Sequence, residues 1–228
     1  MSVFNVGFVI FPQLTQLDFT GPLQVLARLP QSATHIVAKS HAAVPSDCGL
    51  GLMPTQTFAT CPPLDLICVP GGFGVCGAVE DEETVDFVRR QADAARYVTS
   101  VCTGAFVLGA AGLLKGRKAT THWAYTELLP LVGATYEKGR IVKDGKITTA
   151  GGVTSGIDFG LSLAAEIAGE AVAKGIQLAI EYDPDPPFDA GHPDRASEAV
   201  KSSLAGRYEN SRKAYRASLE SVMTITAT

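Results

Sequence analysis

A cysteine lies where a β-branched run gives way to small residues. The run Tyr97–Val101 leads directly into Cys102, and the pattern Ser100-x-Cys102-x-Gly104 matches the G-x-S-x-G elbow of hydrolases, with cysteine in the serine position. Small flanking residues let such a strained turn close, and the amides of a following helix favour the thiolate, which is the nucleophilic form. We interpret Cys102 as a nucleophile. A buried structural cysteine is the alternative.

Two other predicted strands end beside residues that could serve this cysteine. Asp18 follows the first strand, and Gly71 and Gly72 follow a central one. Ligands bind outside the carboxyl ends of the strands in a doubly wound sheet, so we expect these loops to meet. The backbone N–H groups of Gly72 and Thr103 could form an anion-stabilising pocket, and the Thr103 hydroxyl could donate to the thiolate or to a substrate. A tight turn for the glycines and a helix cap for Thr103 are the structural alternatives.

Asp18 and His122 are the candidate proton carriers. Asp18 could donate and accept a proton beside the sulfur if burial and nearby negative charge raise its pKa. Alternatively, it is the N-cap of a helix that begins near Gly21 and Pro22. His122 could be the general base of an amidase or peptidase. No acidic residue stands out in the sequence to orient its ring, so we favour a pocket-lining or structural histidine.

The elements that would position these residues alternate along the chain. Strands that alternate with helices predict an α/β fold with a flavodoxin-like, doubly wound, mainly parallel sheet. Predicted strands cover 3–11, 35–38, 65–69 and 97–101, with short strands or a hairpin over 44–58 and an Asp-Gly hairpin over 141–149. Predicted helices cover 21–29, 82–96, 103–114, 154–168, 170–182 and 195–223, the last as a surface helix, and 183–193 is a loop or arm.

Composition limits the function classes. The 228 residues predict one α/β domain over 1–194 and a C-terminal helical extension over 195–228. The net charge of −4, without a basic patch, argues against nucleic-acid binding. No apolar run is long enough for a membrane span, and the N-terminus lacks the basic start of a signal peptide, so we expect a cytoplasmic protein. Five cysteines without a C-x-x-C pair predict neither a disulfide framework nor a zinc site, and we expect no metal or cofactor.

The motifs resemble the ThiJ/PfpI superfamily, which has the class I glutamine amidotransferase-like fold, and within it the isocyanide (isonitrile) hydratases. The resemblance runs from the N-terminus to about residue 195. Asp18 in place of the longer glutamate common elsewhere in the superfamily is the discriminating feature. The matching stretches are 16–22, 61–65, 70–72, 97–104, 108–114, 119–125 and 151–158.

This resemblance implies a hydro-lyase that converts a small-molecule isocyanide to an N-substituted formamide. It implies that Cys102 is the nucleophile, that a thioimidate forms on its sulfur, and that Asp18 is the general acid and base. It also implies a homodimer. Val153 occupies a position where close relatives often have isoleucine. This difference concerns the local packing near the cysteine rather than the implied chemistry.

Two other readings come from different functional classes. A glyoxalase- or deglycase-like enzyme would use the same cysteine on reactive carbonyls, but such relatives usually favour glutamate at position 18. A non-catalytic ligand-sensing regulatory domain is the other. Related regulators append a helix-turn-helix module, and only 35 residues follow Pro193 here.

Overall fold

The computed structural model describes residues 3–225, and its centre is a seven-stranded sheet. The strand order is β10-β11-β7-β6-β1-β2-β5, and every neighbouring pair is parallel except β10 with β11. The inner order β2-β1-β6-β7-β11 is the 2-1-3-4-5 order of flavodoxin-like sheets. The predicted fold class is therefore confirmed. The strands of this sheet are β1 (Phe4–Val9), β2 (Ser32–Ala38), β5 (Gln56–Thr57), β6 (Leu66–Val69), β7 (Tyr97–Val101), β10 (Ile141–Asp144) and β11 (Ile147–Ala150).

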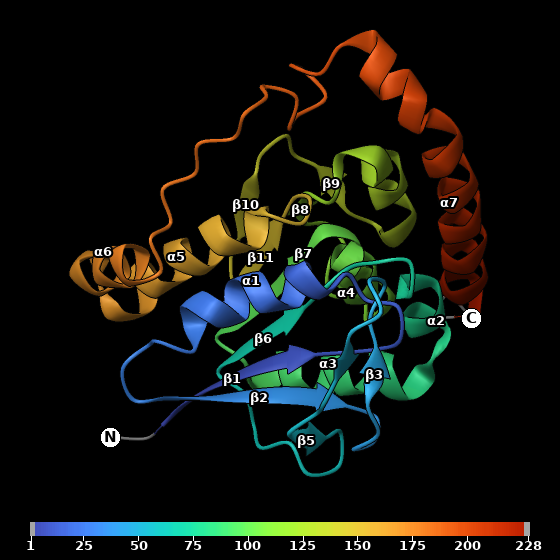
Figure 1. Ribbon diagram of the computed structural model, residues 1–228. Helices are drawn as coiled ribbons and strands as arrows, with labels where there is room; N and C mark the ends of the chain where they lie inside the picture. The colour runs from blue at the N-terminus through green and yellow to red at the C-terminus, as the bar shows by residue number, and fades with distance from the viewer. Residues whose placement is uncertain (1–2, 226–228) are drawn as a thin grey trace.

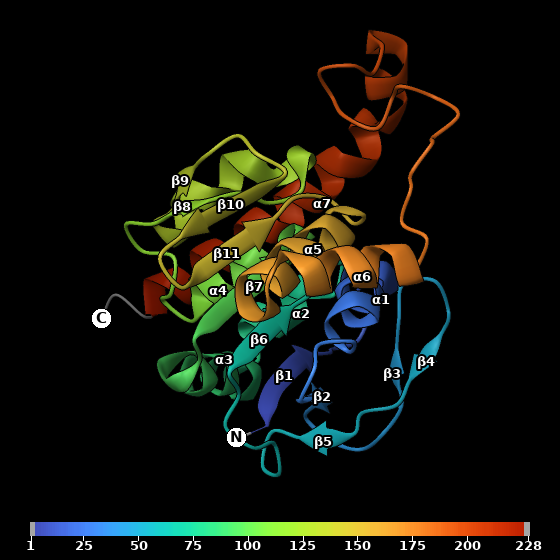
Figure 2. The same ribbon diagram turned by 90° about the vertical axis from the view of Figure 1, so that its left-hand side faces the viewer.

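Helices cover both faces of the sheet. In Figures 1 and 2, α1 and α5 lie together on one face, while α3 and α4 lie on the other. Every residue of β6 and β7 is buried, as expected for central parallel strands covered on both sides. The helices are α1 (Gln16–Leu26), α2 (Val75–Glu80), α3 (Glu82–Ala94), α4 (Ala105–Ala110), α5 (Ser155–Ala168), α6 (Glu170–Ala179) and α7 (Glu198–Ile225).

Short elements complete the described part of the chain. The predicted short strands over 44–58 are β5 and a small hairpin of β3 (Val44–Pro45) with β4 (Gly51–Leu52). A second small pair, β8 (Lys118–Ala119) with β9 (Thr135–Tyr136), and the 3₁₀ segment η2 (Trp123–Val132) lie between the predicted helix over 103–114 and the predicted hairpin over 141–149, where no element is predicted. No helix in residues 3–225 is long and apolar enough to span a membrane.

The first helix differs from its prediction. It begins at Gln16, after the N-cap residue Thr15, and Pro22 lies inside it. Asp18 is therefore in the first helical turn, and the hypothesis that it is the N-cap is wrong. The chain turns into the helix earlier than expected because the Thr15 amide is already anchored, donating to the Gly71 carbonyl at 2.9 Å.

Small residues bring α1 against α5. A Cβ on Gly160 of α5 would lie only 3.0 Å from the Val25 Cβ of α1, and one on Gly156 would lie 2.8 Å from the Pro22 ring. The two helices can approach this closely because glycine has no side chain at either position. They fix the distance between the helix that carries Asp18 and the loop that precedes α5.

The C-terminal helix lies on the surface, as predicted, but one of its faces is buried. Most residues of α7 are exposed, while the helix packs against α2, α4 and η2, and its Tyr215 and Leu219 belong to the main hydrophobic core. Figure 1 shows how it reaches this position: the segment between α6 and α7 arches outside the body before the chain returns along the opposite side. The helix therefore adds core contacts to the sheet domain.

A pair of leucines tests this packing. Leu219 of α7 is completely buried, whereas Leu178 of α6 is 82% exposed. Because truncation of a buried leucine leaves a cavity, we expect Leu219→Ala to lower the free energy of unfolding by about 2–5 kcal/mol. The control Leu178→Ala should change it by less than about 0.5 kcal/mol. Equal stability of the two variants in chemical denaturation would contradict the packing of α7 into the core.

Candidate active site

The elbow at Cys102 has the strained backbone that its sequence predicts. Cys102 has a positive φ of 57°, a conformation that costs a non-glycine residue about 1–2 kcal/mol. Its N–H donates to the Gly151 carbonyl at 2.8 Å, and its carbonyl accepts from the Thr121 hydroxyl at 2.8 Å. A Cβ on Gly104 would lie 2.2 Å from the Val69 carbonyl oxygen, so only glycine lets the turn pass this close to β6.

Three loops meet at this elbow, as the sequence predicts. The Gly71 N–H donates to Asp18 Oδ2 at 2.9 Å. A Cβ on Gly71 would lie 2.9 Å from the Cys102 Cβ and 2.5 Å from the Thr103 nitrogen. The glycine after β6 therefore fills the space between the carboxyl after β1 and the cysteine after β7.

The Asp18 carboxyl is completely buried. Its pKa is raised to about 7, mainly by burial and to a smaller extent by the negative charge of Asp47, while the Gly71 amide and the Cys102 thiol act in the opposite direction. The expected rise in pKa is confirmed, with burial as its main cause. Asp18 Oδ1 has no hydrogen-bond partner of good geometry within residues 3–225, so the thiol contact falls short of a well-formed hydrogen bond. A carboxyl with this pKa can both give and take a proton near neutral pH.

The Cys102 thiol differs from the expectation of a stabilised thiolate. Burial is the main cause that raises its pKa well above the ordinary range, and the charge of Asp18 adds to it. The backbone N–H groups of Thr103 and Val153 lower it, but they do not outweigh burial. The resting group is therefore a thiol, and nucleophilic attack requires a base to remove its proton.

The amide expected from Gly72 has a different partner. The Gly72 N–H donates to Thr103 Oγ1 at 3.0 Å, and the second amide that faces the sulfur belongs to Val153. The Thr103 hydroxyl also lies 3.3 Å from the hydroxyl of Tyr215 on α7. The Gly72 N–H is thus engaged with the Thr103 oxygen, which corrects the anion-stabilising role expected of it. The Thr103 N–H faces the sulfur as expected, and the contact of its hydroxyl is with Tyr215. The contribution of Val153 is a backbone one, which valine supplies as well as isoleucine does.

Cys102 opens into a cavity of about 180 Å³. Aromatic rings form much of its wall, with the guanidinium of Arg207 stacked 5.2 Å from the centre of the Phe73 ring. The residues that line it are Thr15, Asp47, Gly72, Phe73, Cys102, Thr103, His122, Tyr125, Val153, Arg207, Tyr208 and Tyr215.

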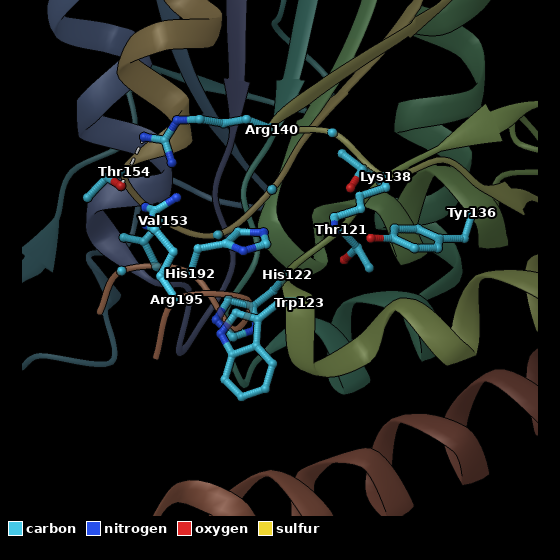
Figure 3. A pocket seen from close by; sticks show the side chains of 15 residues that line it. Thr121, His122, Trp123, Tyr136, Lys138, Arg140, Val153, Thr154, His192 and Arg195 are labelled. Atoms are coloured by element: carbon cyan, nitrogen blue, oxygen red, sulfur yellow. Dashed lines mark hydrogen bonds between the residues drawn. The ribbon is translucent and has the colours of Figure 1, made fainter. Parts of the chain in front are cut away.

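A larger cavity of about 690 Å³ lies beside it and shares the lining residues His122 and Val153 (Figure 3). Its cationic side chains are neutralised in pairs: Lys138 with Asp194, Arg140 with Asp158, and Arg195 with Asp189. Because Cys102 lines the smaller cavity and no cysteine lines the larger one, we place the chemistry in the smaller one.

His122 is part of the wall between the two cavities. Burial lowers its pKa to about 4, so the ring is neutral near pH 7. Its Nδ1 accepts from the Ala124 N–H at 3.2 Å, and in the described part of the chain no carboxylate orients the ring and no hydrogen bond joins it to Cys102. This geometry favours the pocket-lining role. No group of three His, Cys, Asp or Glu side chains within residues 3–225 is placed to hold a metal ion.

The geometry agrees with a known family. A family model described as DJ-1/PfpI matches residues 5–166. The chain belongs to the DJ-1/PfpI family. This match confirms the resemblance seen in the motifs around Asp18 and Cys102.

Several relatives of this DJ-1/PfpI chain are similar over most of its length. The protein named isonitrile hydratase of Pseudomonas putida is 58% identical over 196 residues, which are 86% of each chain. A crystal structure of a ThiJ/PfpI family protein from Pseudomonas syringae has a TM-score of 0.93 and 41% identity, and covers 96% of this chain and 91% of that one. The HTH-type transcriptional regulator GbdR of Pseudomonas aeruginosa is 26% identical over 189 residues, which are 78% of this chain and 51% of the regulator.

The sequence interpretation missed the residues that α7 brings to this DJ-1/PfpI site. Tyr208 and Tyr215 line the cavity from a helix expected on the surface. A signal was present, because Tyr208, Ser211, Tyr215 and Leu219 recur at the three- and four-residue spacing of one helical face. The surrounding charged residues hid it.

Removal of the Asp18 charge tests the electrostatics of the pair. Since that charge raises the pKa of Cys102, we expect Asp18→Asn to lower the thiol pKa. The measurement is a pH titration of ultraviolet thiolate absorbance, corrected with the matching Cys102→Ala proteins. Asp86→Asn on the exposed face of α3 is the control and should leave the titration unchanged. An unchanged or higher thiol pKa in Asp18→Asn would contradict the contact between the two groups.

Proposed function

We propose that this chain hydrates isocyanides to N-substituted formamides, with Cys102 as nucleophile and Asp18 as general acid and base. The observation that carries the proposal is the buried Asp18 carboxyl, which accepts a hydrogen bond from the Gly71 amide and lies beside the buried Cys102 thiol. Burial raises the pKa of both groups. The isonitrile hydratase of Pseudomonas putida, with 58% identity, supports the substrate class.

The first half of the proposed reaction forms a covalent intermediate. Asp18 takes the thiol proton, and the thiolate adds to the terminal carbon of R–N≡C. The same carbon receives the proton from Asp18, which leaves a thioimidate, S–CH=N–R, on Cys102 and an ionised carboxylate. The Thr103 and Val153 amides stabilise the negative sulfur before it attacks.

The second half releases the product. Ionised Asp18 takes a proton from water as the water oxygen adds to the thioimidate carbon, and passes that proton to the nitrogen. The carbon–sulfur bond then breaks, the sulfur leaves as thiolate, and the remaining hydroxyl proton returns to Asp18. The product R–NH–CHO carries one hydrogen from Asp18 and one from water, and the enzyme has regained its starting protons. One carboxyl thus serves both steps without a histidine.

The shape of the cavity suggests which isocyanides fit. A volume of about 180 Å³ suits a compact substituent, and the rings of Phe73, Tyr125 and Tyr208 offer it apolar contact. We therefore propose small alkyl or aryl isocyanides as substrates. We also propose that the chain acts as a cytoplasmic homodimer, as the resemblance implies; a monomeric mass in light scattering would refute the dimer.

Loss of the nucleophile tests the covalent route. We expect Cys102→Ala to abolish formamide production from an aryl isocyanide, because no thioimidate can form. Cys48, which is exposed and outside the cavity, supplies the control: Cys48→Ala should keep the wild-type rate. Substantial turnover by Cys102→Ala would remove Cys102 from the mechanism.

A side-by-side assay separates the two enzymatic readings. The glyoxalase- or deglycase-like alternative uses the same cysteine, so variants at Cys102 do not distinguish it. We expect kcat/KM for isocyanide hydration to exceed kcat/KM for methylglyoxal conversion. The reverse order would favour the carbonyl reading. No turnover of either substrate by the folded protein would favour a ligand-sensing domain, a class to which the similarity with GbdR gives some support.

A further inference from the structure

A tyrosine from the C-terminal helix joins the loops of the site. The Tyr215 hydroxyl donates to the Gly72 carbonyl at 2.6 Å and lies 3.3 Å from Thr103 Oγ1. The Gly72 N–H donates to the same threonine oxygen at 3.0 Å. Gly72, Thr103 and Tyr215 come from three separate segments, so these bonds close a ring between the loop after β6, the cysteine elbow and α7.

The donor and acceptor roles of the two hydroxyl groups in this hydrogen-bonded ring can be assigned. Tyr215 has a single hydroxyl proton, and its short bond to the Gly72 carbonyl uses it. Tyr215 is therefore the acceptor in its contact with Thr103, and the threonine proton points toward the tyrosine oxygen. Thr103 Oγ1 in turn accepts from the Gly72 amide. Each hydroxyl thus has a fixed donor and acceptor role.

The hydrogen-bonded ring of Gly72, Thr103 and Tyr215 holds the loop after β6, and this loop also contacts the Asp18 carboxyl. Gly71 immediately precedes Gly72, and its N–H donates to Asp18 Oδ2. Its own carbonyl accepts from the Thr15 amide at 2.9 Å. A shift of Gly72 therefore moves the Gly71 amide, which stabilises ionised Asp18.

The tyrosine ring is itself held firmly. Tyr215 is 2% exposed, and its ring packs 4.9 Å from the centre of the Tyr125 ring and 5.8 Å from that of Phe106. These ring contacts do not need the hydroxyl. A phenylalanine at this position keeps the packing and removes only the two hydrogen bonds.

We propose that Tyr215 is a positioning residue for the Asp18–Cys102 pair: its hydroxyl ties the Gly71–Gly72 loop to Thr103 and keeps the Gly71 amide on the Asp18 carboxyl. The inference rests on the proposed roles of Asp18 and Cys102. It gives the C-terminal helix a part in the reaction through the position of the Gly71–Gly72 loop.

The test compares Tyr215→Phe with Tyr182→Phe. The Tyr182 hydroxyl also donates a hydrogen bond, to Asp158 at 2.8 Å, but that residue lies outside the cavity. We expect Tyr215→Phe to lower kcat for isocyanide hydration about tenfold or more, since small misplacements of reacting groups are costly. KM should change by less than about twofold, because the cavity wall is retained. Tyr182→Phe should change neither constant.

A second readout is independent of isocyanide turnover. In the proposed mechanism ionised Asp18 removes the thiol proton, so the rate of Cys102 alkylation by iodoacetamide near neutral pH should follow the ionisation of Asp18. The Gly71 amide lowers the pKa of Asp18, so its displacement should raise that pKa and move the alkylation profile upward by roughly half a unit or more. Tyr182→Phe should leave the profile in place. The titratable or charged side chains that line the cavity around the pair are Asp47, His122, Tyr125, Arg207, Tyr208 and Tyr215, and only the last is altered.

The outcomes separate positioning from packing. A Tyr215→Phe protein with wild-type kcat and an unshifted alkylation profile would overturn the inference, and so would a lower melting temperature with an unshifted profile. Coupling with Thr103 is the further check: Tyr215→Phe and Thr103→Val should cost less together than the sum of their separate effects on kcat. If wild type fails to hydrate isocyanides but the alkylation shift is present, the proposed function fails and the positioning role stands.

Discussion

The site depends on one interaction: the buried Asp18 carboxyl accepts a hydrogen bond from the Gly71 amide and lies against the buried Cys102 thiol. Burial raises the pKa of Asp18 to about 7 and raises that of Cys102 as well. Neither group is then a strong acid or a ready nucleophile alone. Because the two share an environment, a proton can pass between them and onto a substrate carbon. The Gly71 amide adjusts this balance through its 2.9 Å bond to Asp18.

The fold supplies the close approaches that this interaction needs. Parallel strands place the loops after β1, β6 and β7 at one edge, and glycine is required where the loops touch. Gly71 leaves no room for a Cβ against Cys102 and Thr103, and Gly104 leaves none against β6. The strained backbone of Cys102 is held by Gly151 and Thr121, which belong to other segments. The α7 helix completes the enclosure with Tyr215, so the exclusion of water also depends on the end of the chain.

Local signals in the sequence predicted much of this arrangement. Alternating elements indicated the parallel sheet, the Ser100-x-Cys102-x-Gly104 pattern indicated the elbow, and the rule for strand ends brought Asp18 and Gly71 to it. The predicted start of α1 is too late, because proline favours the first helical turn, whereas Pro22 lies inside this helix. Contacts between distant segments were not predictable in the same way. The Val153 amide and the Tyr215 hydroxyl reach the site through tertiary packing, and the protonated state of Cys102 follows from burial, which outweighs the helix-terminus effect that the local pattern suggested.

The central claim is that Asp18 carries the protons of the reaction, and kcat/KM of Asp18→Asn for an alkyl or aryl isocyanide tests it most directly. The substitution keeps the size of the side chain and increases the thiolate character of Cys102, so slower turnover cannot come from a weaker nucleophile. Loss of general acid–base catalysis predicts a decrease of about 10²–10⁴-fold relative to wild type. A decrease of less than about threefold would be much smaller than this expected loss and would contradict the account.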